Sequence, residues 1–371
     1  MKTKRTILHI TTNYTQNGGI GHWLLNTIPA KSQNYSHSLC IIGRSRADEL
    51  KDSPKSRLKF EKIIDISMPF VLWPLQMFKL IIVVLKIRPK LVIIHQGWLG
   101  AITALLCALC LVRTRILYFH TGDWDHARGV IKDHVALVLV GLGKVIATDF
   151  WFASEGCKEK WLKKTEVSRV AVVQTGIELL KGAVIEKSVA RRKLGLSDNA
   201  FVIGHVGRFT EPKNHEFIIA VMHEILKKEA NCILLLVGDG PLRENINNKA
   251  RQLGLLNNVI FLGTRTDVFA CLSAMDVFIF PSHYESLGIS VLEAQVVGLP
   301  VVTSNVPGLS EAIAPCWSQF SHSVDDVESF VSSVLSLKTT ERYIPTAFLE
   351  KFSTETASAN FEAKLLWAES N

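Results

Sequence analysis

The sequence has no uninterrupted apolar run long enough to cross a membrane. A spanning helix needs about 20 consecutive apolar residues. The run at 69–87 is interrupted by Pro74 and Lys79, and the run at 97–112 is too short. We therefore expect both runs to be crossover helices of a parallel sheet, each buried on one face. Contact of their other face with a bilayer surface is left open.

Cysteine pairs with the spacing of a metal site are also scarce. Of seven cysteines, only Cys107 and Cys110 form a C-x-x-C pair, inside an apolar helical run and without a second pair. This disfavours a zinc or redox role and indicates buried thiols in a reducing compartment. The apolar part after the basic residues 1–5 is too short for a signal peptide. A cytoplasmic location is expected.

The chain lacks the complete fingerprints of two other protein classes. Gly18, Gly19 and Gly21 follow the first strand pattern, but they do not form a full G-x-G-x-x-G, and no acidic residue ends a second strand where a dinucleotide ribose would need it. This disfavours a nicotinamide dehydrogenase. No basic motif interleaved with aromatic residues is present, which disfavours nucleic acid as a partner.

What is present indicates a folded protein of two domains. A chain of 371 residues exceeds one typical core, and 48% apolar with 20% charged residues is typical of globular proteins. The net charge of +8 is uneven, with +12 in residues 1–178 and −4 in residues 179–371. The basic half favours an anionic membrane surface or an anionic lipid-linked acceptor as a partner.

The most informative stretch is 277–303. The short apolar run Val277–Phe280 ends at a proline and predicts a buried parallel strand. A polar loop with Glu285 follows, Ser286 is a candidate helix cap, and 287–297 has helical spacing. Another apolar run, 301–303, predicts the next strand. The sequence thus predicts one strand–loop–helix–strand unit.

This unit has groups that can bind a nucleotide sugar. The first backbone N–H groups of the helix, at Leu287, Gly288 and Ile289, can hold a phosphate. Glu293, when ionised, can accept hydrogen bonds from both hydroxyls of a ribose, and Glu285 lies where a second sugar would sit. The alternative is an ordinary strand–helix unit with two surface glutamates.

The stretch resembles a known family. Pro281-Ser282-x-x-Glu285-Ser286-Leu287-Gly288, Leu292-Glu293-Ala294 and Gly298-Leu299-Pro300-Val301-Val302 are similar to the E-x7-E region of family-4 retaining glycosyltransferases, and weaker similarity extends over nearly the whole chain. The resemblance implies an α/β protein with the GT-B fold, two Rossmann-like domains separated by a deep cleft. We expect an acceptor-side domain at 1–178, whose last strands are 145–153 and 170–174. A nucleotide-sugar domain at 179–351 is expected to begin with a linker at 179–193, and a C-terminal helix at about 352–371 is expected to pack back on the first domain.

A second motif carries two cations. Arg208 and Lys213 lie on a loop between a strand pattern at 201–206 and a helix pattern at 215–229. The arginine fork can bind a phosphate with two hydrogen bonds, and the lysine supplies a movable charge. Together they would neutralise a diphosphate leaving group. The pair resembles the Arg and Lys of the family on this loop; a solvated basic turn is the alternative.

The resemblance implies further donor contacts. Gly19 lies in a loop similar to the glycine loop that the family places against the donor, and the backbone near Gly263 and Arg265 corresponds to the segment that pairs with the nucleobase. His120 follows directly after a strand pattern, where ligand crevices of α/β sheets lie, and the family directs a histidine there at the donor sugar. Asp123 and Asp125 imitate a metal-binding pair, but the resemblance argues against a metal.

The sequence therefore predicts a retaining, metal-independent glycosyltransferase that uses no cofactor. Its donor is a nucleotide diphosphate sugar, expected to be a UDP-sugar carrying a hexosyl or N-acetylhexosaminyl group. The acceptor is expected to be a lipid-linked oligosaccharide or a growing surface polysaccharide (O-antigen, capsule or exopolysaccharide). A sugar-nucleotide epimerase, a phosphorylase or a non-catalytic sugar-nucleotide-binding protein remain alternatives. Peripheral contact with the inner face of the plasma membrane fits the charge distribution.

Overall fold

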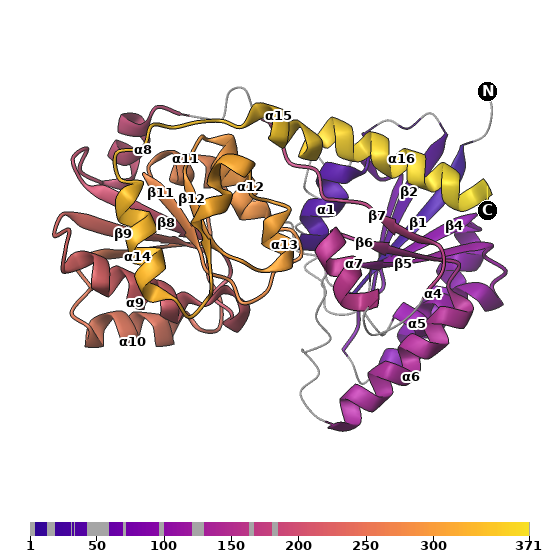
Figure 1. Cartoon of the computed structure of the whole chain (residues 1–371). Coiled ribbons are helices and arrows are strands. Elements are labelled where there is room, and N and C mark those ends of the chain that lie inside the picture. Colours follow the sequence, from indigo (N-terminus) through magenta and orange to yellow (C-terminus); the bar gives the residue numbers. More distant parts are fainter. Residues whose placement is uncertain are drawn as a thin grey trace. The chain divides into compact units, whose positions relative to one another are not determined.

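A computed structural model describes residues 4–12, 19–30, 32, 34–42, 59–69, 72–95, 100–120, 130–162, 167–179 and 185–370; for 130–137 it describes the backbone only. The chain forms two compact units (Figure 1). Unit 1 consists of Met1–Gly176 with Thr354–Asn371, and unit 2 consists of Ile177–Ser353.

Unit 1 contains a parallel sheet whose described strands run in the order β3-β2-β1-β4-β5-β6-β7. The strands are β1 (Arg5–Thr11), β2 (Tyr35–Ile41), β3 (Lys62–Asp65), β4 (Leu91–His95), β5 (Thr114–Phe119), β6 (Asp149–Phe152) and β7 (Val170–Val172). Their apolar runs fit strands buried on both faces. The strand order reverses between β1 and β4, and in such sheets ligands bind beyond the carboxyl ends of the strands at the reversal.

Helices cover both faces of this sheet. One face is covered by α1 (Gly19–Thr27) and the C-terminal helix α16 (Thr354–Ser370), whose Trp23 and Phe361 are fully buried (Figure 1). The other face is covered by α4 (Trp73–Ile87), α5 (Gly100–Leu109), α6 (Val130–Ile146) and α7 (Glu155–Leu162). Both long apolar runs are therefore helices of the parallel sheet. Among the helices that the structure describes, none combines the length and apolar character of a membrane span.

Unit 2 contains a second parallel sheet, with its described strands in the order β10-β9-β8-β11-β12-β13. They are β8 (Phe201–Val206), β9 (Cys232–Val237), β10 (Val259–Gly263), β11 (Val277–Phe280), β12 (Val301–Ser304) and β13 (Ser321–His322). The helices are α8 (Lys187–Leu194), α9 (His215–Leu226), α10 (Arg243–Gln252), α11 (Val268–Ser273), α12 (Ile289–Val296), α13 (Pro307–Ser310), α14 (Val327–Ser336) and α15 (Thr346–Leu349). The predicted fold of two Rossmann-like α/β domains is confirmed. Here the order reverses between β8 and β11.

The structure corrects three local predictions. Residues 179–193 were expected to be a linker, but 187–194 form α8, because Arg191 is buried and its guanidinium donates to Asp276 at 2.6 Å. Val145, expected to begin a strand, lies in the last turn of α6. Helix α12 begins after Gly288, which adopts φ +73°, so the expected cap at Ser286 is wrong.

Candidate functional site

Two loops meet at the point of unit 2 where the strand order reverses. Strands β8 and β11 are hydrogen-bonded neighbours, so the loops that follow them leave the same edge of the sheet. The first loop continues into the short 3-10 helix η2 (Glu211–Lys213), and the second spans 281–288. A backbone hydrogen bond from His283 N to Pro212 O, 2.8 Å long, joins the two loops.

The structure pairs Lys213 with Glu285, two residues that the sequence predicted from separate motifs. The ammonium group forms an ion pair with Oε1 of the carboxylate. Ser282 donates a hydrogen bond to the same oxygen at 3.1 Å, and the Lys213 ammonium lies 4.8 Å from the centre of the Phe280 ring. The side chains are 22% and 11% exposed, so both members of the pair remain partly exposed to solvent.

The other predicted cation, Arg208, is exposed on the first loop. Its neighbour Phe209 is buried, and the Phe209 amide donates to Asp239 O at 3.0 Å, which holds the backbone directly after Arg208. Gly238 sits beneath this loop with φ +131°, and a Cβ there would lie 2.0 Å from Gly207 O. A residue without a side chain is therefore required at 238.

The N-terminus of α12 lies at the end of the second loop. Gly288 is the N-cap residue in a left-handed conformation, and no side chain caps the helix. The backbone N–H groups of Ile289 and Ser290 belong to the first turn, where a helix offers no internal acceptor and where an anion is favoured. Leu287 is buried in an apolar cluster with Phe352 and anchors this end of the helix.

Glu293 lies in the second turn of α12 and is partly buried. Burial raises the pKa of its carboxyl group to about 7, and the nearby carboxylate of Glu178 acts in the same direction. The carboxylate that a ribose requires is thus only partly present at neutral pH.

The predicted nucleobase segment follows β10. The Gly263 carbonyl accepts a hydrogen bond from Gly238 N at 2.8 Å. The guanidinium of Arg265 donates two hydrogen bonds to the carboxylate of Asp267, with Nε–Oδ1 and Nη2–Oδ2 distances of 2.8 and 2.7 Å. Two of the five N–H donors of Arg265 are therefore engaged by Asp267.

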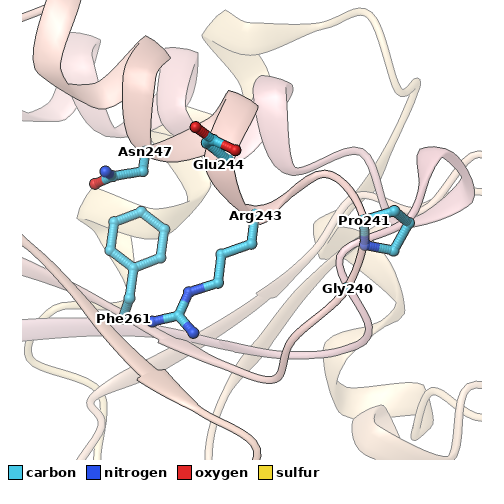
Figure 2. Close-up of a pocket in the computed structure, with 6 residues that line it drawn as sticks. All are labelled: Gly240, Pro241, Arg243, Glu244, Asn247 and Phe261. Atoms are coloured by element: carbon cyan, nitrogen blue, oxygen red, sulfur yellow. The ribbon is translucent and has the colours of Figure 1, made fainter.

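An open pocket of about 490 Å³ lies beside this segment. Its lining residues are Gly240, Pro241, Arg243, Glu244, Asn247 and Phe261. Figure 2 shows the Gly240–Pro241 turn on one side and the other four side chains on the opposite side. None of these lining residues is a predicted site residue. The pocket adjoins the segment predicted to meet the nucleobase but does not contain the Lys213–Glu285 pair.

Two predicted residues belong to unit 1. Gly19 is the exposed first residue of α1. His120 directly follows β5, and its Nε2 lies 2.8 Å from Nδ1 of His95, the last residue of β4. Burial lowers the pKa of His120 to about 3, so at pH 7 the ring is neutral and forms hydrogen bonds without acting as an acid. Asp123 and Asp125 lie outside the described residues.

Comparison with known families agrees with this geometry. Residues 186–351 match the family of glycosyl transferases group 1. The match covers most of unit 2 and somewhat less than half of the chain, and it supports the predicted enzyme class. The matched segment includes both loops and helix α12.

Curated relatives and solved structures extend the likeness. EpsF of Bacillus subtilis, named as a glycosyltransferase, is 38% identical over 57% of this chain and 56% of its own. An Escherichia coli UDP-Gal:alpha-D-GlcNAc-diphosphoundecaprenol alpha-1,3-galactosyltransferase is 31% identical over 48% of each chain. The chain thus spans about half the length of these relatives.

Two solved structures resemble nearly the whole chain. HepE of Anabaena, solved with UDP and glucose, has a TM-score of 0.80 at 16% identity over 97% of this chain and 98% of its own. Sucrose-phosphate synthase of Thermosynechococcus elongatus has a TM-score of 0.73 at 17% identity over 99% of this chain and 100% of its own. At these identities the likeness concerns the fold, and it supports the predicted GT-B architecture.

The sequence did not single out several residues that the structure places beside the predicted ones. Ser282 holds the Glu285 carboxylate, and its own carbonyl accepts from Ser304 Oγ at 2.5 Å. In unit 1, the ring nitrogens of His95 lie within hydrogen-bond distance of His120 on one side and of His9 on the other. Ser304 and His95 each end an apolar strand pattern with a polar residue, and this pattern could have indicated them from the sequence.

Proposed function

We propose that the chain is a retaining, metal-independent glycosyltransferase that moves a hexosyl or N-acetylhexosaminyl group from a nucleoside diphosphate sugar to a hydroxyl acceptor. The observation that carries this proposal is the Lys213–Glu285 contact, which joins two motif loops at the strand reversal of the domain that matches the family. Ligand binding at that edge follows from the architecture of open α/β sheets.

Unit 2 supplies the diphosphate site. Arg208, Lys213 and the first amides of α12 bind the diphosphate and stabilise the charge that builds up as the glycosidic bond breaks. Because these groups carry the charge stabilisation, no divalent ion is required. A leaving phosphate oxygen takes the proton of the acceptor hydroxyl, which attacks from the same face and retains the anomeric configuration.

Other residues orient the donor. Glu293 binds the ribose hydroxyls, Glu285 contacts the donor sugar, and the backbone at Gly263 meets the base edge. Gly19 and His120, from unit 1, also contact the donor, the histidine through a neutral imidazole. No covalent intermediate is involved, and neither carboxylate acts as a nucleophile.

The donor and the acceptor are proposed from the relatives. HepE was solved with UDP and glucose, which supports a UDP-sugar as donor. The E. coli relative is named for transfer to GlcNAc-diphosphoundecaprenol, which supports a lipid-diphosphate-linked acceptor in surface polysaccharide assembly. The excess positive charge of residues 1–178 is suited to such an anionic acceptor.

Helix α4 supports peripheral membrane contact. Its inner face packs on the sheet, while the opposite face exposes large apolar side chains, with Phe78 60% exposed. Exposed lysines lie on the same helix, and further exposed cations come directly after its last residue. The exposed residues are Leu75, Phe78, Ile82, Leu85, Lys79, Lys86, Arg88 and Lys90. An apolar stripe flanked by lysines and arginines fits the headgroup region of an anionic bilayer.

A turnover assay tests the enzymatic proposal. The purified chain is incubated with UDP-glucose, UDP-galactose or UDP-N-acetylglucosamine and a lipid-diphosphate-linked N-acetylglucosamine, with and without EDTA. We expect UDP release that depends on acceptor, resists EDTA, and yields an α-linked product by NMR. Epimerised donor or sugar phosphate without acceptor would assign the chain to another GT-B activity. Activity lost in EDTA and restored only by Mg²⁺ or Mn²⁺ would refute the metal-free mechanism.

A vesicle assay tests membrane contact. Binding to vesicles of phosphatidylglycerol and phosphatidylcholine should exceed binding to phosphatidylcholine alone and should fall as salt is raised. The double variant Phe78→Ser/Leu85→Ser should release the protein from anionic vesicles. Val138→Ser, at an exposed apolar residue of helix α6, measures the effect of a single apolar loss outside α4. Equal retention of wild type and double variant would contradict the proposal.

A further inference from the structure

Two buried histidines of unit 2 lie at the base of the loop that carries Arg208 and Lys213. His205 belongs to β8 and His215 is the first residue of α9, and the loop runs between them. The two residues are 0% and 1% exposed. Their ring centroids lie 4.8 Å apart, and the ring planes are nearly perpendicular, at 81°. Neither residue was predicted as a site residue, so their place beside the two predicted cations calls for a physical explanation.

A hydrogen bond and a stacked ring fix the orientation of His205. Burial lowers the pKa of His205 well below its ordinary value, so the ring is neutral at pH 7. Its Nδ1 lies 2.9 Å from the carbonyl oxygen of Ile279 in the neighbouring strand β11. A carbonyl oxygen only accepts, so the hydrogen of the neutral ring is on Nδ1 and Nε2 is bare. The ring of Phe280 stacks on the same imidazole, with centroids 5.1 Å apart.

The bare nitrogen of His205 lies against Gly207, the residue directly before Arg208. A Cβ at position 207 would be 2.7 Å from Nε2, and its three nearest atoms all belong to this imidazole. That distance is too short for a carbon atom, so an alanine would have to displace the ring or the loop. Gly207 does not have a positive φ. The close approach of the His205 ring, rather than the backbone conformation, therefore requires glycine here.

The imidazole of His215 supports Phe209, the residue directly after Arg208. The two rings stack at a centroid distance of 4.0 Å and an angle of 23°. Burial lowers the pKa of His215 to about 4, and the charge of Lys213 acts in the same direction, so this ring is neutral as well. Neither of its nitrogens has a hydrogen-bond partner among the described residues. What the ring supplies to the loop is therefore packing against Phe209.

The same rings reach the second cation. The Phe280 ring, which stacks on His205, also lies 4.8 Å from the ammonium group of Lys213. An aromatic column of four contacting rings thus runs from the neighbour of Arg208 to the ammonium of Lys213; in order, its members are Phe209, His215, His205 and Phe280. Protein interiors are close-packed and transmit displacement. A change in one ring of the column therefore alters the separation of the two cations.

We infer that His205 and His215 are positioning residues, which set the place of the two cations that bind the diphosphate. His205 supports the backbone directly before Arg208, and His215 supports the residue directly after it. Neither imidazole touches the substrate. The inference rests on the proposed function, because it takes the two cations to bind a diphosphate. The required accuracy is high, since a displacement of about 1 Å in an active site can lower the rate by about 10²-fold.

Three variants of α9 test the ring contact. His215→Leu removes the ring that stacks on Phe209, His215→Phe keeps an aromatic ring there, and His223→Leu replaces a histidine in the last turn of the same helix as a control. Affinities for UDP and for uridine, which has no phosphate, are measured by titration. We expect His215→Leu to weaken UDP binding by about 10-fold and to leave uridine binding unchanged. His215→Phe should restore most of the loss, and His223→Leu should change neither affinity.

A double-variant cycle tests the His205 contact separately. Gly207→Ala places a Cβ against Nε2 of His205, and we expect it to weaken UDP binding by about 10-fold. In the background of His205→Ser the ring is gone, so the same substitution should weaken UDP binding by less than about threefold. Equal losses in the two backgrounds would show that His205 does not position this loop. Because this cycle uses other positions than the α9 variants, either experiment can overturn the inference without the other.

The outcomes separate the inference from the proposed function. Equal weakening of UDP and uridine binding by His215→Leu indicates a histidine that only stabilises the fold and overturns the inference, as does a His215→Phe variant as weak as His215→Leu. A chain that transfers sugar while its UDP affinity is independent of both histidines contradicts the inference alone. A chain whose UDP affinity depends on both histidines, yet which transfers sugar to no acceptor, contradicts the proposed function and leaves the inference intact.

Discussion

Replacing Lys213 with methionine isolates the charge proposed to bind the diphosphate. Methionine keeps an apolar stem over the Phe280 ring, which the ammonium now faces at 4.8 Å, but it removes the positive charge. The ion pair with Glu285 is lost as well. The substitution therefore has two consequences of different size, one for the free protein and one for the reaction.

The magnitudes distinguish these consequences. A partly exposed ion pair contributes about 0–1 kcal/mol, which corresponds to at most about a fivefold change in an equilibrium or rate. Loss of one charge-stabilising group in a transition state costs about 2.7–4 kcal/mol, or about 10²- to 10³-fold. If Lys213 binds the departing diphosphate, kcat/KM of Lys213→Met should fall by the larger factor. If it only holds Glu285, the smaller factor applies.

Steady-state kinetics and calorimetric titration with UDP measure both effects. We expect Lys213→Met to weaken UDP binding and Glu285→Gln, which can still accept from Ser282, to leave UDP binding unchanged. Lys227→Met is the control, because Lys227 pairs with Glu224 on the exposed side of α9 and should affect neither quantity. Unaltered UDP affinity together with less than a fivefold loss of kcat/KM in Lys213→Met would refute the diphosphate role.

Three further predictions concern the same unit. The pKa of Glu293 is raised from 4.5 to about 7, by burial first and by Glu178 second, so its contribution to the unfolding free energy is complete below pH 4.5 and is lost as pH rises through 7. Glu293→Gln should therefore flatten the fall of the unfolding free energy over this pH range. The UDP affinity of the wild type should rise from pH 6 to 8 as the carboxylate forms. Arg191→Met leaves the shielded carboxylate of Asp276 without its guanidinium partner and should lower the free energy of unfolding in urea by about 3–5 kcal/mol. Lys187 pairs with the same carboxylate from the exposed side, so Lys187→Met should lower it by only about 0–1 kcal/mol. Alanine at position 288 must keep φ near +73°, so Gly288→Ala should lower the free energy of thermal unfolding by about 1–2 kcal/mol and weaken UDP binding. Unchanged stability would show that another backbone conformation serves as well.

The sequence predicted the strands at the candidate site well, because their signal is local. Short runs of apolar residues bounded by glycine or proline reproduced β8 and β11 to the residue. The motif residues after these strands could be named because a parallel sheet brings the carboxyl ends of its strands to one edge. The contact between Lys213 and Glu285, 72 residues apart, could not be derived from either motif alone.

Helix boundaries were harder to predict where a distant contact decides them. The charged segment 187–194 resembles a solvated linker, yet it forms a helix because Arg191 inserts toward carbonyl oxygens and the carboxylate of Asp276, which directly precedes β11. The start of α12 depends on a left-handed glycine, and the pattern of apolar residues carries no information about the sign of φ. In both cases the sequence had the right residues but not their partners.

The contacts among the buried histidines of unit 1 lie further from what local patterns can predict. His9, His37 and His95 occur singly, each in a different strand, and only the register of two strand pairs makes them neighbours. A hydrogen bond between buried groups contributes only about 1 kcal/mol net, whereas a buried donor or acceptor left without a partner costs about 1–3 kcal/mol. The register therefore supplies hydrogen-bond partners for ring nitrogens that no single strand pattern could have shown to be satisfied.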